Sequence, residues 1–250
     1  MGLSSSQQIY TKPICLLSPT VSVIIPAFNE ARSIARVIDI VRQTSFTSEI
    51  IIVDDGSTDG TGEIASEAAE NDSRIRVISH PVNLGKGQAV FNGALVCSNS
   101  IIMTLDADLI GLKPEYLVQL AKPVMESKAD MTLGIFRGGK LASDLSHWIT
   151  PWLSGQRCFR LGMLNYVSKE AAAGYGFETA LTLAAKQRDW RCQQIIWYGV
   201  SHPPSEYHRG RWRGMKTRAK MYSQILRAFY IIAIRQWIGK YLKTPLEFIL

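Results

Sequence analysis

Long apolar runs are missing from this chain of 250 residues. No stretch reaches the roughly 18 uninterrupted apolar residues that a membrane-spanning helix needs. The opening residues are polar and lack the apolar core of a secretory signal. Cysteine is scarce as well, with four scattered residues that form no CxxC pair: Cys15, Cys97, Cys158 and Cys192. Their scatter excludes a zinc ribbon and indicates free thiols in a reducing compartment, so we expect a cytoplasmic protein.

Acidic residues are nearly absent from the end of the chain. After Ser201, ten basic residues stand against two acidic ones, which gives this segment a net charge of +8 and leaves −1 for the rest of the +7 chain. The basic residues are Arg209, Arg211, Arg213, Lys216, Arg218, Lys220, Arg227, Arg235, Lys240 and Lys243. The basic character therefore belongs to one segment.

This basic segment predicts an amphipathic helix over about 212–240, in which charges alternate with aromatic and aliphatic residues. Such a helix can lie on an anionic membrane surface as a peripheral element on the cytoplasmic face. It can also pack on the folded domain or on a partner chain, as in a homodimer. Nucleic-acid binding needs a recognised module, and none is visible, so we expect no nucleic-acid partner. We favour a packed or peripheral membrane helix, because Arg227 and Arg235 make the apolar run too short to span a bilayer.

One sizeable core is expected at this length. Composition is ordinary for a soluble protein, 46% hydrophobic and 20% charged, and neither repeats nor low-complexity segments interrupt it. We expect a flexible N-terminus over 1–18, an α/β domain over 19–205 with halves at 19–110 and 111–205, and a basic helical extension over 206–250.

Strand and helix patterns alternate at βαβ spacing up to Asp108, which predicts a doubly wound, mostly parallel sheet. We expect strands over 21–25, 50–53, 74–79 and 101–105, with helices over 30–42, 61–70 and 87–96. Further along we expect a helix over 114–127, a strand over 130–136, no clear periodicity over 137–162, a helix over 177–186 and a strand over 192–197. Irregular segments of this kind usually shape or cover a substrate pocket.

The acidic triplet Asp106-Ala107-Asp108 follows the apolar run 101–105, a buried parallel strand. Ligands of open α/β sheets bind beyond the carboxyl ends of such strands. Two carboxylates this close repel each other unless a cation lies between them, and hard oxygen ligands suit Mg²⁺ or Mn²⁺, which usually arrive with phosphates. For an isolated triplet, a solvated pair that caps the next helix is the better interpretation.

The loop after the first strand fits a nucleotide. The backbone of Pro26, Ala27 and Phe28 can pass close to a flat base, and Glu30 can accept hydrogen bonds from ribose hydroxyls. The alternative is a helix N-terminus with Asn29 as its cap and Glu30 favoured by the helix dipole. Both can hold at once.

Two further loops follow strands two and three. Asp54 or Asp55, ahead of Gly56, can accept the imide N–H of uracil, and the alternative is an Asx turn with Gly56. Residues 83–87, Asn-Leu-Gly-Lys-Gly, place Lys86 between two glycines at a helix start, which fits a phosphate contact. The spacing of a Walker loop is absent.

These segments in this order resemble the signature of family 2 glycosyltransferases: 21–30, 53–61, 83–87 and 106–108. The resemblance implies a GT-A fold with a nucleotide-sugar half over 19–110 and an acceptor half over 111–205. The implied donor-binding residues are Pro26, Ala27, Phe28, Glu30, Asp54, Asp55, Gly56, Lys86, Asp106 and Ala107. A processive polysaccharide synthase is disfavoured, because no QxxRW motif is present.

The second half resembles glucosyl-3-phosphoglycerate synthases and dolichyl-phosphate sugar synthases. Residues 153–156 look like their acceptor-loop LSG motif, 174–178 like their GYG-x-E helix start, and 199–202 like the place of their metal-binding histidine. Arg157 and Arg137 are separate candidates for contacts with an acidic acceptor. The resemblance implies Ser154 and Gly155 at the acceptor, and Asp106, Asp108 and His202 around Mg²⁺ or Mn²⁺. His208 is an alternative ligand. A solvated surface is the alternative for Arg157 and the favoured interpretation for Arg137.

The chemistry that this resemblance implies is cleavage of an anomeric C–O bond with a nucleoside diphosphate leaving. Asp108, Lys86 and Glu178 are the catalytic candidates. Glu178 holds sugar hydroxyls or acts as a base, or else it is an ordinary first-turn acid. We expect a hexosyltransferase that uses UDP-glucose or a similar donor and a phosphorylated or lipid-linked acceptor. The rivals are a polyprenyl-phosphate sugar synthase, a nucleotidyltransferase and a catalytically silent binding module.

Overall fold

A computed structural model describes residues 20–137, 154–168, 172 and 176–203 of the protein. The predicted N-terminus over 1–18, the basic extension over 206–250 and its helix, and His208 lie outside these residues. Among the residues that are described, no helix combines the length and apolarity that a bilayer crossing would require.

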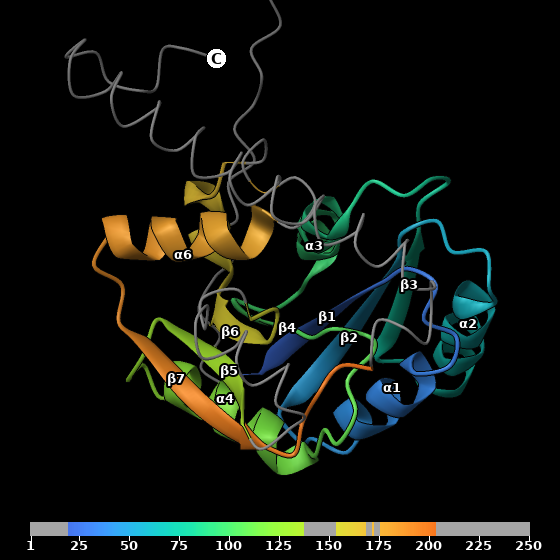
Figure 1. The fold of residues 1–250 in the computed structure, drawn as a ribbon, viewed down its shortest axis with the longest axis horizontal. Helices are drawn as coiled ribbons and strands as arrows, with labels where there is room; N and C mark the ends of the chain where they lie inside the picture. Colours follow the sequence, from blue (N-terminus) through green and yellow to red (C-terminus); the bar gives the residue numbers. More distant parts are fainter. Residues whose placement is uncertain (1–19, 138–153, 169–171, 173–175, 204–250) are drawn as a thin grey trace, which may run out of the picture.

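A seven-stranded sheet forms the centre of the fold, with the strand order β3-β2-β1-β4-β6-β5-β7 (Figure 1). Strands β1 to β4 pair in parallel, and β5 pairs in parallel with β7. The strands are β1 (Val21–Ala27), β2 (Thr47–Asp54), β3 (Ile75–Ser79), β4 (Ile101–Thr104), β5 (Met131–Arg137), β6 (Arg157–Arg160) and β7 (Cys192–Tyr198). The predicted α/β, mostly parallel arrangement is confirmed.

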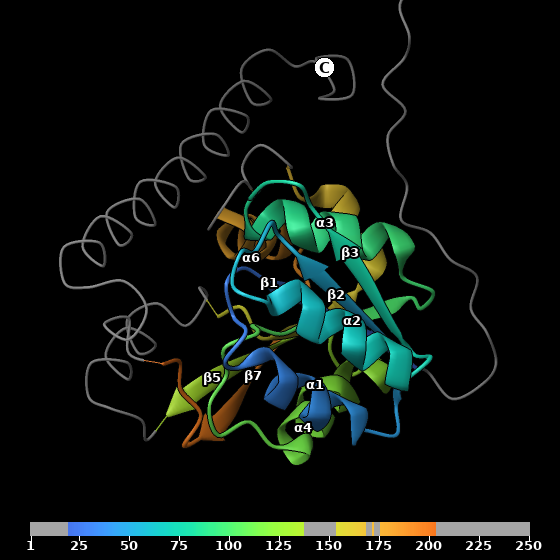
Figure 2. The same cartoon turned by 90° about the vertical axis from the view of Figure 1, so that its right-hand side faces the viewer.

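Helices cover both faces of this sheet, as the two views show (Figures 1 and 2). Alternation along β1 explains the two layers, because Ile24 packs into the cluster that holds α3 and α6, whereas Val23 and Ile25 pack into the cluster that holds α1, α2 and α4. The helices are α1 (Ile34–Arg42), α2 (Thr61–Asn71), α3 (Lys86–Val96), α4 (Pro114–Met125) and α6 (Phe177–Gln187), with a 3₁₀ helix at Leu161–Tyr166.

Strand β6 is the main departure from the expected topology. It lies antiparallel between β4 and β5, pairing Met103 with Cys158 and Thr132 with Cys158. We had expected no regular element over 137–162, but four residues, Arg-Cys-Phe-Arg, are too few to show a strand period. This strand brings the segment just before it, residues 154–156, alongside the acidic triplet.

The first helix also begins later than its pattern predicts. It starts at Ile34 instead of residue 30, and the backbone N–H groups of Glu30 and Ala31 donate to Thr61 Oγ1 at the start of α2 and to Asp59 Oδ2 in the loop before it. Asn29 adopts a left-handed φ of 59°, which asparagine tolerates better than most residues, and it is not the helix cap. The alternative with Asn29 as the helix cap is therefore wrong, and Ser33 is the N-cap residue.

Candidate functional site

The loops after β1 and β2 are joined by hydrogen bonds at the carboxyl edge of the sheet. The backbone N–H of Asn29 donates to Ser57 Oγ at 2.9 Å, and Asn29 Oδ1 accepts from the N–H of Thr58 at 2.9 Å. The N–H of Glu30 donates to Thr61 Oγ1 at 2.8 Å. The polar run after Asp55 therefore fixes the loop of the predicted base contact, a role that the sequence interpretation missed.

Asp54 and Asp55 are both buried and both accept backbone hydrogen bonds. Asp54 Oδ1 accepts from the N–H of Ser57 at 3.0 Å, three residues further on, whereas the Asx turn considered as an alternative would use the N–H of Gly56, two residues on. Asp55 accepts from the N–H groups of Leu84 and Gly85 at 2.9 and 2.8 Å and pairs with His80 Nδ1 at 2.7 Å. Asp55 thus anchors the loop that leads to Lys86, and the uracil contact stays a prediction.

The acidic triplet meets His202 through a short antiparallel bridge. Ile110 and Ser201 exchange backbone hydrogen bonds of 2.9 and 3.1 Å. This pairing places His202, which follows Ser201, beside Asp108, which lies two residues before Ile110. His202 Nδ1 consequently lies 2.8 Å from Asp108 Oδ1, and its Nε2 lies 3.8 Å from Asp106 Oδ2.

These three side chains fit a divalent cation. One ligand atom from each of Asp106, Asp108 and His202 lies within 4.8 Å of the others. Carboxylate oxygens with an imidazole nitrogen suit Mn²⁺ and Mg²⁺.

Lys86 joins two carboxylates on opposite sides of the site. Its Nζ lies 2.5 Å from Asp106 Oδ1 and 2.6 Å from Glu178 Oε1. Lys86 is the first residue of α3, and Glu178 lies in the first turn of α6, so the two helices on one face of the sheet supply the pair. The structure thus brings together Lys86, Glu178 and the acidic triplet, which are far apart in the sequence.

Electrostatics differ sharply among these groups. Burial opposes ionisation of Asp106, but the Lys86 ammonium, with His202, lowers the pKa of Asp106 to about 2. For Lys86, burial is likewise outweighed by Asp106 and Glu178, which raise its pKa. Burial, with the negative charge of Asp108, raises the pKa of Glu30 to about 7. The site therefore carries an excess of negative charge that a cation would relieve.

Residues 154–157 lie next to the Lys86–Asp106 pair or directly behind it. Gly155 lies against the Lys86–Asp106 pair, since a Cβ placed on it would be 2.7 Å from Asp106 Oδ1. Ser154 is buried and donates to the carbonyl of Gly134 at 2.5 Å. Arg157 is fully buried, with its Nε donating to the carbonyl of Ser154 at 2.8 Å. The structure places Gly155 at the site and Ser154 and Arg157 behind it, so the predicted acceptor contacts stay predictions.

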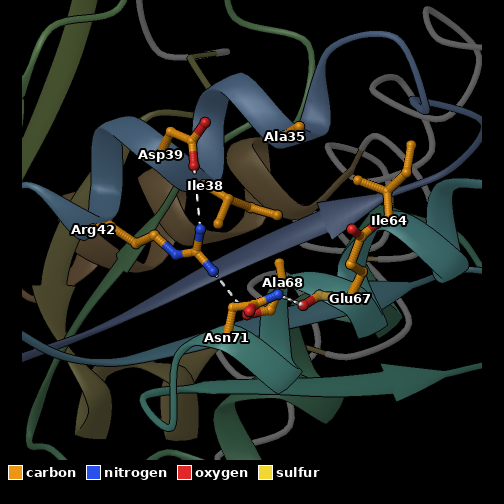
Figure 3. A pocket seen from close by; sticks show the side chains of 8 residues that line it. All are labelled: Ala35, Ile38, Asp39, Arg42, Ile64, Glu67, Ala68 and Asn71. Atoms are coloured by element: carbon orange, nitrogen blue, oxygen red, sulfur yellow. Dashed lines mark hydrogen bonds and ion pairs between the residues drawn. The ribbon is translucent and has the colours of Figure 1, made fainter.

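A separate hollow of about 290 Å³ lies between α1 and α2 (Figure 3). The Arg42 guanidinium crosses it to donate to the carbonyl of Ala68 at 2.7 Å, and pairs with Asp39 at 3.2 Å. None of the predicted site residues lines this hollow. It is a seam between two helices, apart from the site.

Residues 22–180 match the family described as Glycosyl transferase family 2. This chain belongs to that family. Dolichyl-phosphate beta-glucosyltransferase ALG5C of Trichomonas vaginalis is 39% identical over 94 residues, which cover 34% of this chain and 28% of that protein. Glucosyl-3-phosphoglycerate synthase of Mycobacterium tuberculosis is 36% identical over 137 residues, covering 51% of this chain and 41% of the relative. The matches to the first curated relatives span only 28% to 39% of their length.

The fold is also similar to that of a solved structure. A crystal structure of the Mycobacterium tuberculosis glucosyl-3-phosphoglycerate synthase with Mn²⁺, UDP and glucosyl-3-phosphoglycerate has a TM-score of 0.67 and 26% identity, covering 84% of this chain and 78% of that one. The expected GT-A fold is confirmed for the described residues.

Proposed function

We propose that this protein is a metal-dependent hexosyltransferase that moves a sugar from a nucleoside diphosphate sugar, such as UDP-glucose, to a phosphorylated or lipid-linked acceptor. The observation that carries the proposal is the cluster of Asp106, Asp108 and His202 beside Lys86, at the edge of the sheet where nucleotides bind. A divalent cation with an adjacent ammonium group is suited to a diphosphate leaving group.

In this proposal the charge of each residue decides its role. Asp106, Asp108 and His202 hold Mg²⁺ or Mn²⁺, which as a Lewis acid stabilises the charge that grows on the departing diphosphate. Lys86 adds a fixed positive charge at the same place. Glu178 keeps Lys86 oriented through the 2.6 Å ion pair, and its proposed second role is to accept hydrogen bonds from sugar hydroxyls.

The acceptor class is supported by relatives of two kinds. One solved relative holds glucosyl-3-phosphoglycerate, a phosphorylated small molecule. Others are named for transfer to dolichyl phosphate and undecaprenyl phosphate, which are lipid-linked. The undecaprenyl-phosphate mannosyltransferase of Micrococcus luteus is 28% identical over 197 residues, covering 69% of this chain and 80% of that protein. A phosphate group is common to glucosyl-3-phosphoglycerate and to the two lipid acceptors.

A donor screen tests the proposal. We expect one UDP- or GDP-sugar, together with Mn²⁺, to raise the melting temperature, because a ligand that binds only the folded chain stabilises it. The same donor should be hydrolysed slowly without an acceptor. The Asp108→Ala variant should show neither effect. If no donor shifts the wild type, or if the Asp108→Ala variant responds equally, the donor site is misassigned.

If His202 is a metal ligand, the affinity for Mn²⁺ should depend on pH. Burial opposes its charge, but Asp108 and then Asp106 raise the pKa of His202 above its ordinary value. Protonated His202 therefore stabilises the metal-free protein below about pH 6.5, and this stability is lost as pH rises through the raised pKa. A metal ion needs the neutral imidazole, so Mn²⁺ affinity should rise over the same range.

The measurement is the melting temperature between about pH 6 and about pH 9, with and without Mn²⁺. We expect the shift caused by Mn²⁺ to grow with pH in the wild type and to be smaller and flatter in the His202→Asn variant. An Mn²⁺ shift that shrinks with pH would show that His202 is not a ligand.

A further inference from the structure

Gln156 holds Asp106 at two points. Its Oε1 accepts from the backbone N–H of Asp106 at 2.9 Å, and its Nε2 donates to Asp106 Oδ2 at 2.6 Å. The Gln156 side chain is almost fully buried, with an exposed fraction of 1%. A buried amide must satisfy both its oxygen and its nitrogen, and here one residue meets both needs.

The backbone of Gln156 is itself fixed to the sheet. Its carbonyl accepts from the N–H of Gly134 in β5 at 2.8 Å, and its N–H donates to Ser154 Oγ at 3.3 Å. Gly134 leaves room for it, since a Cβ placed there would lie 3.1 Å from Gln156 Cβ. The amide therefore reaches Asp106 from a rigid support and has little freedom to turn elsewhere.

The two oxygens of Asp106 consequently have different neighbours. Oδ1 lies against the Lys86 ammonium, whereas Oδ2 accepts from the neutral Gln156 amide and faces His202 Nε2 at 3.8 Å. A neutral donor leaves the carboxylate its full charge, and one hydrogen bond leaves Oδ2 a second lone pair. Without Gln156, Lys86 would be the stronger attraction and could draw both oxygens toward itself.

We propose that Gln156 is a positioning residue: it fixes the Asp106 carboxylate so that Oδ2 is presented to the divalent cation. This inference rests on the proposed function, because it assumes that Asp106, Asp108 and His202 bind the ion. Hydrogen-bonding partners of metal-ligating carboxylates typically change metal affinity or activity by about 10- to 100-fold when they are removed.

The test compares the full-length wild type with the Gln156→Met and Gln156→Asn variants. Methionine keeps the volume but cannot hydrogen-bond in this way, whereas asparagine keeps the amide and withdraws it by one methylene. We expect both to bind Mn²⁺ about 10- to 100-fold more weakly in a direct titration with UDP present. Turnover should recover at saturating Mn²⁺, so that the KM for Mn²⁺ rises much more than kcat falls.

The matched control is Thr132→Val, which removes a buried hydrogen bond of 2.6 Å from Thr132 Oγ1 in β5 to the carbonyl of Leu120 in α4. It should lower the melting temperature and leave Mn²⁺ affinity unchanged. Wild-type Mn²⁺ affinity in either Gln156 variant, or a similar loss in Thr132→Val, would overturn the inference. Absence of Mn²⁺ binding by the wild type would instead overturn the proposed function, so the two failures are distinguishable.

Discussion

Replacement of Lys86 by methionine should slow sugar transfer about a hundredfold and leave Mn²⁺ binding intact or tighter. Lys86 is the cation between Asp106 and Glu178, at 2.5 and 2.6 Å, and no ligand role is assigned to it. Loss of one charge that stabilises a departing diphosphate typically costs about 3 kcal/mol in the transition state. In this variant Asp106 would no longer pair with the Lys86 ammonium group, so Mn²⁺ would not have to compete with that group for the carboxylate.

The same replacement should destabilise the metal-free protein. Glu178 is 4% exposed, and without Lys86 it would be a buried carboxylate near Asp106, which contacts the same Lys86 Nζ. Removal of one partner from a buried ion pair typically costs about 3 kcal/mol or more, because the remaining charge is left uncompensated. Added Mn²⁺ should therefore recover more of the melting temperature in Lys86→Met than it adds to the wild type.

Turnover at several Mn²⁺ concentrations and melting curves with and without the ion test both expectations. Lys122→Met is the matched control, because Lys122 is 66% exposed and lies 3.9 Å from Glu126 on the surface of α4. It should change neither quantity beyond error. Unchanged turnover in Lys86→Met would remove Lys86 from the chemistry.

The pattern of the sequence was sufficient to predict that the candidate site residues meet at one edge of the sheet. Parallel strands end at one edge of a sheet, so residues after β1, β2 and β4 had to meet there once the strands were recognised. Asp106 and Asp108 follow β4 directly, and Lys86 follows the loop after β3. The apolar runs that locate these strands are buried on both faces, which gives them an unambiguous signal.

Contacts that depend on the tertiary fold could not be predicted in this way. Gln156 lies before a strand of four residues that carries no detectable period, and its partner Asp106 is 50 residues away. The resemblance of residues 153–156 to an acceptor-loop motif does not predict that the Gln156 side chain contacts Asp106. The antiparallel register of β6, which brings Gln156 to Asp106, is decided by packing between β4 and β5.

The start of the first helix was predicted four residues too early, because the sequence does not show the hydrogen bonds that Glu30 and Ala31 make in the fold. Glu30 follows an apolar strand and precedes a helical period, which favours a helix start in the sequence. In the fold, its N–H donates to Thr61 Oγ1 and the next N–H donates to Asp59 Oδ2. The side chains of Asp59 and Thr61 thus accept from the backbone N–H groups that a helix-capping side chain would otherwise satisfy.

Substitution of Gly155 by alanine should abolish most of the activity while the protein still folds. A Cβ at this position would lie 2.7 and 2.8 Å from the two carboxylate oxygens of Asp106 and would also contact the Lys86 Nζ. These neighbours are the ends of side chains, so they can turn away without disruption of the backbone. The cost is that Asp106 and Lys86 leave the places where a cation and a diphosphate need them, and we expect a loss of about a hundredfold in turnover.

The Gly93→Ala variant is the control that separates displacement of Asp106 and Lys86 from overpacking elsewhere in the protein. A Cβ at Gly93 would lie 2.8 Å from Ile24 Cγ2 and 3.2 Å from Val53 Cγ2, inside the core beneath α3. Overpacking of this kind typically costs about 1–3 kcal/mol of stability, yet no site residue is displaced. We therefore expect Gly93→Ala to lower the melting temperature more than the turnover, and Gly155→Ala to do the reverse. Equal losses of turnover in the two variants would mean that close packing at Gly155 serves the fold and not the chemistry.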